Sequence, residues 1–355
     1  MRRRNNTRPD PALPASLYVH IPFCRSKCPY CAFYSVIPVP GAPTAFLEAL
    51  EGEIDLLSQS VDRPRLRTAY IGGGTPTLLS PHDWVRLISV LEGAFTFSSD
   101  TEMTVEANPG SLTREHLALW KDWRVTRVSL GIQSLQDADL LAMGRAHDSR
   151  QALESMAEIK RRGLSLSVDL LFGLPGQKLR GWSDTLRIVL NEGAEHLSIY
   201  ELTLEAGTPW GSHPPGNLAE GYPFYRWAQY YLENKGWLQY ETASFSKPRR
   251  WCRHNVAYWT GAPFLGIGPS AWGYNGTTRT ANVSDLELYR WMIKKGIRPT
   301  LFAETLEGKR RAFELSVLAL RTRWGVRHQE YRRRWGDQML KEFQDSLEGL
   351  PPHLF

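Results

Sequence analysis

The feature that most constrains the fold is a regular alternation of short apolar segments with longer amphipathic segments. The apolar segments are rich in β-formers and span residues 17–21, 68–74, 102–110, 127–134, 166–176 and 195–205. Segments with helical periodicity lie between them, near residues 44–58, 81–94, 113–123, 137–143, 150–162 and 181–191. This order predicts βαβ units and a parallel sheet. Six units are fewer than the eight that close a barrel, so we expect an α/β fold with a partial (β/α)6 barrel.

The alternation stops near residue 210, where the chain becomes rich in aromatic residues. We therefore expect a disordered basic leader over residues 1–16, a partial-barrel domain over 17–210 and a smaller C-terminal accessory domain over 211–355. The sequence "KRRAFELSVLAL" predicts a helix in this last part, near residues 309–320.

Composition excludes several classes of protein. No run of about 18 or more uncharged apolar residues is present, so we expect no transmembrane segment, although peripheral membrane contact stays open. The basic N-terminus has no apolar stretch behind it and does not resemble a signal peptide. Four cysteines in 355 residues indicate a reducing cytoplasm and not a disulfide scaffold. The net charge of +6 comes without a nucleic-acid motif, so we expect no nucleic-acid partner.

Three of the cysteines lie in one short loop, "HIPFCRSKCPYCAFYS", directly after the first expected strand. Cys24, Cys28 and Cys31 form a C-x3-C-x2-C pattern, and thiolates suit zinc or iron–sulfur clusters. A structural zinc ion needs four ligands and would have to take the fourth from His20 or Cys252. A [4Fe-4S] cluster held by three cysteines instead leaves one iron open to a substrate or cofactor.

Polar and glycine-rich residues follow the later strands, where parallel α/β proteins place their sites. "GGGTP" (residues 72–76) closes the second strand, where glycines let a backbone approach a ligand closely and expose its amides. Glu106 ends the third strand, Gln133 the fourth, and Arg145 follows in "GRAHD". Asp169 lies inside an otherwise apolar strand, where a carboxylate needs a hydrogen-bond partner.

The cysteine loop resembles that of the radical S-adenosylmethionine (SAM) superfamily, in which an aromatic residue such as Tyr30 accompanies the three cysteines. The resemblance implies a [4Fe-4S] cluster on Cys24, Cys28 and Cys31, with SAM on the open iron. In that superfamily an electron from the cluster cleaves SAM to a 5′-deoxyadenosyl radical. It also implies that "GGGTP" receives the SAM amino group and that Glu106 bonds the ribose hydroxyls.

The later motifs "GGGTP", "GIQS", "GR.H" and "D..FGLPGQ" together resemble one branch, the oxygen-independent coproporphyrinogen III oxidases and their relatives. The resemblance covers most of the chain, from about residue 17 to 320. The residues that it implies for the SAM site are Tyr18, Tyr30, Gly73, Gly74, Thr75, Glu106, Gln133, Arg145 and Asp169.

Two features of the sequence bear on oxidase activity. The true oxidases carry a further cysteine two residues after the third, where this chain has Phe33. The segment "RHNVAYW" (253–259) resembles the H-N-x-x-Y-W signature of heme chaperones derived from the oxidase fold, which implies a heme contact at His254. From the residues alone, we favour a turn cap at His254 and Asn255 beside core aromatics over a heme contact. In a second segment of the chaperones, Trp272 replaces their usual histidine.

We therefore expect a radical SAM-type heme chaperone that binds a [4Fe-4S] cluster, SAM and heme. Its expected partners are a heme-accepting protein and an electron donor. The alternatives are a coproporphyrinogen III oxidase, which converts propionate side chains to vinyls, a related radical SAM methyltransferase or heme-degrading protein, and a structural zinc protein. The sequence does not decide whether SAM is cleaved or only bound, so enzyme activity stays open.

Overall fold

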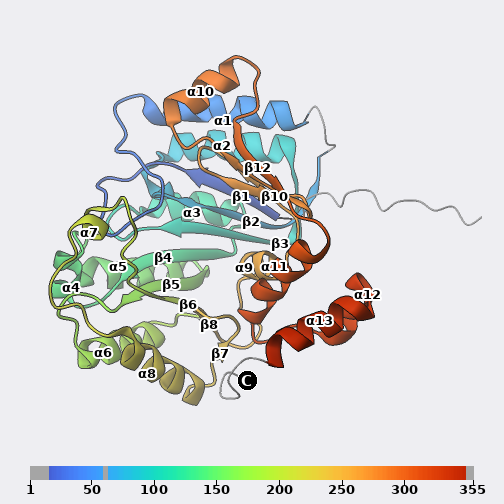
Figure 1. The fold of residues 1–355 in the computed structure, drawn as a ribbon. Coiled ribbons are helices and arrows are strands. Elements are labelled where there is room, and N and C mark those ends of the chain that lie inside the picture. The colour runs from blue at the N-terminus through green and yellow to red at the C-terminus, as the bar shows by residue number, and fades with distance from the viewer. Residues whose placement is uncertain (1–15, 59–62, 349–355) are drawn as a thin grey trace, which may run out of the picture.

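A computed structural model describes residues 16–58 and 63–348 of the chain. Its centre is a curved sheet of twelve strands in the order β12-β11-β10-β9-β1-β2-β3-β4-β5-β6-β8-β7 (Figure 1). The expected leader, residues 1–16, lies outside the described part except for Ser16, which begins β1.

The middle of the sheet consists of the six expected strands, all parallel and in chain order. They are β1 (Ser16–Ile21), β2 (Arg65–Gly73), β3 (Thr96–Ala107), β4 (Arg127–Gln133), β5 (Ser165–Phe172) and β6 (His196–Glu201). The connecting helices are α1 (Ala42–Ser58), α2 (Pro81–Ala94), α3 (Arg114–Asp122), α4 (Asp137–Ala142), α5 (Ser149–Arg161) and α6 (Leu179–Asn191), with a 3-10 turn, η1 (Pro76–Leu78). Since β1 and β6 are not paired, the barrel stays open, and the prediction of a partial (β/α)6 barrel is confirmed.

The two faces of this sheet differ in chemistry because successive side chains of a strand point to opposite sides. One face packs against the helices and forms the main core. Its strand residues, each at most 1% exposed, include Leu17, Val19, Ile71, Val105, Val128, Leu130, Leu166, Val168 and Leu197. The other, inner face carries a row of polar side chains, namely Tyr18, Tyr70, Glu106, Ser129, Asp169 and Ser198. The inner face can therefore bind a polar ligand.

Strands from the second part of the chain extend both edges of the parallel sheet. At one edge, β8 (Ser244–Ser246) pairs antiparallel with β6, and β7 (Leu238–Gln239) pairs with β8. At the other edge, β9 (Phe264–Ile267) runs parallel to β1. An antiparallel meander follows, made of β10 (Trp272–Tyr274), β11 (Thr278–Asn282) and β12 (Thr300–Thr305).

The second part of the chain adds further helices, of which one packs beside α1 and another beside α6. They are α7 (Pro209–Ser212), α8 (Gly221–Asn234), α9 (Arg253–Trp259), α10 (Leu286–Lys294), α11 (Gly308–Leu320), α12 (His328–Trp335) and α13 (Asp337–Glu348). Figure 1 shows α12 and α13 at the margin of the molecule, beyond α11. A separate small core of Ala312, Tyr331, Leu340 and Phe343 joins these three helices. The boundary at residue 210 stays a prediction, since strands from both sides of it share one sheet.

Within residues 16–58 and 63–348, the chain forms no helix that is both long and apolar enough to span a lipid bilayer.

Candidate functional site

The candidate site lies at the carboxyl ends of β1 to β4, where the loop after β1 carries the cysteines. The backbone holds the two ends of this loop together, because Cys24 N donates to Val36 O at 3.0 Å and Val36 N donates to Pro22 O at 2.7 Å. Phe23 anchors the loop in the core, with its ring 5.5 Å from that of Phe46. These contacts hold in place the ends of the loop that carries the three thiols.

Cys24, Cys28 and Cys31 are unpaired and half-buried. Cys24 Sγ lies 3.6 Å from Thr75 Oγ1, and Arg145 Nη1 donates to Cys28 Sγ at 3.6 Å. Burial raises the pKa of the Cys31 thiol, and the neighbouring Cys28 and Cys24 thiols raise it further. The fold therefore gathers the three thiols around one small region, facing the end of β2 and a guanidinium group.

The two side chains that could complete a zinc site, His20 and Cys252, have other partners in this structure. Within the described residues, no group of three or more His, Cys, Asp or Glu side chains is gathered as ligands of one metal ion. His20 uses Nδ1 toward Tyr18 Oη at 3.1 Å and Nε2 toward Tyr34 O at 3.0 Å. Cys252 is buried and donates to Glu102 Oε1 at 3.6 Å. The thiolates of an iron–sulfur cluster bind different iron atoms, so they need not converge on one point.

The glycine segment after β2 lies directly against the cysteine loop. A Cβ on Gly74 would lie 2.5 Å from Phe23 O, and Gly73 has a φ of +108°, which favours glycine. Gly74 N donates to Ile21 O at 2.8 Å, and Thr75 N donates to Phe23 O at 2.6 Å. Gly73 N donates to Glu106 Oε2 at 2.9 Å. The expectation that this segment exposes its amides is therefore wrong, because all three donors bind within the protein.

A hydrogen-bond network joins this segment to Arg145. Asn108 Nδ2 donates to Thr75 Oγ1 at 2.9 Å, and Asn108 Oδ1 accepts from Arg145 Nη2 at 2.7 Å. The same Nη2 donates to Gly131 O at 2.8 Å. Arg145 Nε is buried and has no hydrogen-bond partner in the described part of the chain, which leaves a donor for a ligand. Asn108 was missed from the sequence, although it follows a strand two residues after Glu106.

Glu106 braces the glycine segment from the inner face of the sheet. Its Oε1 accepts from Tyr70 Oη at 2.8 Å and its Oε2 from Gly73 N at 2.9 Å. Burial, together with the charge of Asp169, raises the pKa of Glu106 to about 7. Tyr70 was missed from the sequence, because nothing distinguishes it from a core tyrosine before the strands are placed in register.

Asp169 and Gln133 lie on neighbouring strands. Both carboxylate oxygens of Asp169 accept from Ser129 Oγ, at 3.2 and 3.1 Å. Burial raises the pKa of Asp169 to about 6, against the hydrogen bonds from Ser198 and Ser129. Gln133 ends β4 with a φ of +67°, a strained conformation for a residue with a side chain. Such strain is often found at ligand sites.

Two tyrosines complete the set of expected SAM residues. Tyr30 lies beside Cys28, and its ring is 5.7 Å from that of Trp210. Burial is the main cause that raises the pKa of Tyr30. Tyr18 lies next to Tyr70 on the inner face, with ring centroids 6.2 Å apart. Tyr30 therefore adjoins the cysteine loop, while Tyr18 lies deeper along β1.

His254 is a packed core residue in this structure. It is 1% exposed, and its ring stacks on Tyr70 at 5.2 Å. Its Nδ1 lies 2.8 Å from Thr68 Oγ1 and its Nε2 lies 2.8 Å from Tyr258 Oη. With both ring nitrogens hydrogen-bonded, this geometry lends no support to heme ligation by His254, which stays a prediction. Trp272, at the chaperones' histidine position, is 48% exposed.

The residues at the site fit the groups that the cysteine pattern implies. Three free thiols lie beside a cation, a close backbone cradle is built from glycines, and the buried Arg145 Nε has an unused donor. These residues lie at the mouth of the open partial barrel. A partial barrel with three thiols at its mouth is the arrangement that the radical SAM resemblance implies.

Comparison with known proteins agrees with this class. The family described as the Radical SAM superfamily matches residues 18–189. "Heme chaperone HemW" of Bacillus subtilis is 33% identical, over 95% of this chain and 89% of that protein. "Radical S-adenosyl methionine domain-containing protein 1, mitochondrial" of Bos taurus is 34% identical, over 89% of this chain and 75% of that protein.

The solved structure of coproporphyrinogen III oxidase (HemN) from Escherichia coli has the same fold. It superposes with a TM-score of 0.86 at 21% identity, over 97% of this chain and 84% of that one. The fold and the sequence of the chain therefore indicate the same superfamily. The chain belongs to the HemW family of the radical SAM superfamily.

Proposed function

We propose that this protein is a heme chaperone that binds a [4Fe-4S] cluster and SAM and transfers heme to an acceptor protein. The observation that carries the proposal is the residue two places after Cys31, which is Phe33 and not the further cysteine of the oxidases. Phe33 is 71% exposed. The names of the HemW relatives support the same function.

In this proposal Cys24, Cys28 and Cys31 hold the cluster, and the surrounding residues hold SAM. When bound, the cluster and SAM would supply one-electron cleavage chemistry or act as a switch for heme release. Arg145 would orient SAM through its unused Nε, while Glu106 keeps the glycine segment in place. The other residues proposed to line the SAM site are Tyr18, Tyr30, Gly73, Gly74, Thr75, Gln133 and Asp169.

The proposed setting is the cytoplasm, where all four cysteines, which are free in this structure, stay reduced. A heme-accepting protein and an electron donor are the proposed partners.

The cluster is tested by iron and sulfide analysis after anaerobic reconstitution. Wild type is expected to hold about four of each per chain, as a [4Fe-4S] cluster requires. A triple Cys24→Ala, Cys28→Ala, Cys31→Ala variant is expected to hold almost none. Cys252→Ala is the matched control and should keep the wild-type content, because Cys252 is buried against Glu102. Normal cluster content in the triple variant would rule out the proposed ligands.

The choice between chaperone and oxidase is tested by anaerobic incubation with coproporphyrinogen, SAM and a reductant. We expect no vinyl product, together with heme binding and transfer of heme to an apo-hemoprotein. The TM-score of 0.86 with the oxidase concerns the fold alone and favours neither function. Formation of a vinyl product would replace the chaperone by the oxidase.

A further inference from the structure

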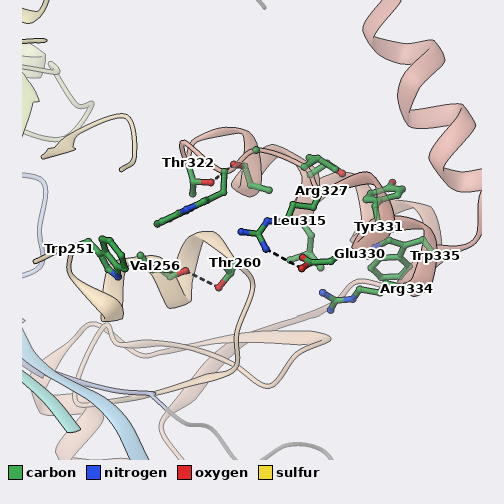
Figure 2. Close-up of a pocket in the computed structure, with 15 residues that line it drawn as sticks. Trp251, Val256, Thr260, Leu315, Thr322, Arg327, Glu330, Tyr331, Arg334 and Trp335 are labelled. Atoms are coloured by element: carbon green, nitrogen blue, oxygen red, sulfur yellow. Dashed lines mark hydrogen bonds and ion pairs between the residues drawn. The ribbon is translucent and has the colours of Figure 1, made fainter. Parts of the chain in front are cut away.

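A pocket of about 410 Å³ lies outside the barrel, between α9, α11 and α12 (Figure 2). Its volume is within the usual range for small-molecule sites. Val256 of α9 and Thr260, which follows this helix, line the pocket, whereas His254 of α9 is buried against β2. The helix α9 therefore separates this pocket from the inner face of the sheet.

Aromatic side chains form much of the pocket wall. Trp251 and Trp324 meet edge to face, with ring centroids 6.0 Å apart, and Tyr331 and Trp335 line the α12 side. Leu315 adds an aliphatic surface. Walls of this kind bind the faces of a flat aromatic ligand.

The α12 side also carries a net positive charge, because Glu330 pairs with Arg327 and leaves Arg334 without a carboxylate. The guanidinium groups of Arg334, which lines the pocket, and of Arg311 lie 5.1 and 5.5 Å from the centroid of the Trp335 ring. Within the described residues neither arginine has an ion-pair partner, and the buried Arg311 Nε has no hydrogen-bond partner. Burial and the charge of Arg311 lower the pKa of Arg334. Two neighbouring cations of this kind favour a bound anion.

We propose that this pocket binds the heme, with the aromatic side chains against the ring and with Arg334 facing its carboxylates. The inference rests on the proposed chaperone function and gives it a site. In this proposal the heme lies on the opposite side of α9 from His254, so this site replaces the heme contact expected at His254. Arg327 is already paired with Glu330 at 3.3 Å, so Arg334 supplies the available charge within the pocket.

The first test is titration of hemin into wild type and variants, followed by absorbance. Arg334→Gln is expected to weaken binding by about tenfold or more, the effect of losing one charged hydrogen bond. The matched control is Arg332→Gln on the same helix, since Arg332 is paired with Asp337 and does not line the pocket. Trp324→Ala should also weaken binding, whereas Trp291→Ala, an exposed tryptophan of α10, should not. Circular dichroism melting checks that each variant is folded.

The second test removes the carboxylates from the ligand instead of the arginine from the protein. Wild type should bind hemin more tightly than hemin dimethyl ester, and Arg334→Gln should lose most of this preference. If wild type binds hemin and every variant binds it equally well, the pocket is not the site, and the chaperone function still stands. If wild type binds no hemin, the proposed function itself fails, and this inference fails with it.

Discussion

Gly74 is the residue at which β2 touches the cysteine loop, and it shows how a single hydrogen atom in place of a side chain shapes the site. A Cβ there would lie 2.5 Å from Phe23 O and 2.9 Å from Ile21 O, both backbone atoms that cannot rotate away. The hydrogen bond from Gly74 N to Ile21 O holds the two backbone segments together at this point. The position of the thiols therefore depends on this close approach.

We predict that Gly74→Ala destabilises the protein by about 1–3 kcal/mol, the usual cost of overpacking. Iron content after reconstitution should fall well below that of wild type, because the loop is displaced. Gly93→Ala is the control, since nothing lies within 4 Å of a Cβ there and alanine favours the helix. Thermal melting and iron analysis check both variants. Wild-type iron content in Gly74→Ala would contradict this role.

The burial of His254 predicts that the stability of the protein depends on pH. Burial lowers the pKa of His254 to about 3, from an ordinary value of 6.5. Below pH 6.5, His254 of the unfolded chain takes up a proton that His254 of the folded chain does not. The contribution of neutral His254 to the free energy of unfolding is therefore fully present above pH 6.5 and is lost as the pH falls toward 3. The loss from this residue at pH 5 is about 2 kcal/mol.

The measurement is denaturant unfolding at pH 7 and pH 5. His254→Gln should show a smaller difference between the two pH values than wild type, while exposed His82→Gln should show the wild-type difference. An equal difference in His254→Gln and wild type would mean that His254 is not held neutral in the folded state.

At the scale of elements, a buried carboxylate on α1 helps to hold the strands that extend the sheet beyond β1. Glu53 accepts hydrogen bonds from Gly268 N at 2.7 Å, from Tyr289 Oη at 2.6 Å and from Asn282 Nδ2 at 2.6 Å. Burial raises the pKa of Glu53. One side chain thus joins α1 to the segment after β9, to β11 and to α10.

We predict that Glu53→Ala destabilises the protein by about 3 kcal/mol or more, because three buried donors lose their acceptor. Glu51→Ala on the same helix should cost no more than about 1 kcal/mol, since its pair with Arg86 is partly exposed. Chemical denaturation measures both variants. Equal costs would show that Glu53 does not attach these strands.

At the scale of the whole molecule, the edges of the parallel sheet are completed by segments distant in sequence. β1 pairs with β9 and β6 pairs with β8, so residues 17–210 alone would leave both edges unpaired. Unpaired edges promote aggregation. In contrast, α12 and α13 pack around a small core of their own.

We predict that a fragment of residues 1–210 is insoluble or unfolded, whereas a chain ending at residue 326 keeps a melting temperature within about 5 °C of wild type. Size-exclusion chromatography and circular dichroism distinguish these outcomes. A monomeric, cooperatively melting 1–210 fragment would show that the boundary at residue 210 separates two independent domains.

The sequence by itself determined the six βα units, because the period of apolar residues is a local property of the chain. It also determined the cysteine motif, whose spacing is readable without a fold. The tertiary structure alone decided what the inner face contains. Asn108 and Tyr70 belong to the site only because strand register places them beside Thr75 and Glu106.

Contacts between residues distant in sequence also explain which features of the fold and the site the sequence could not predict. β9 is short and pairs with a strand 248 residues earlier in the chain (Ser16 opposite Phe264), so no local pattern indicates it. The buried environment of His254 depends on Thr68 and Tyr258, which contact it only after α9 has packed against β2. Local patterns thus fixed the elements and the thiol ligands, and long-range packing decided which polar side chains face a ligand and which lie in the core.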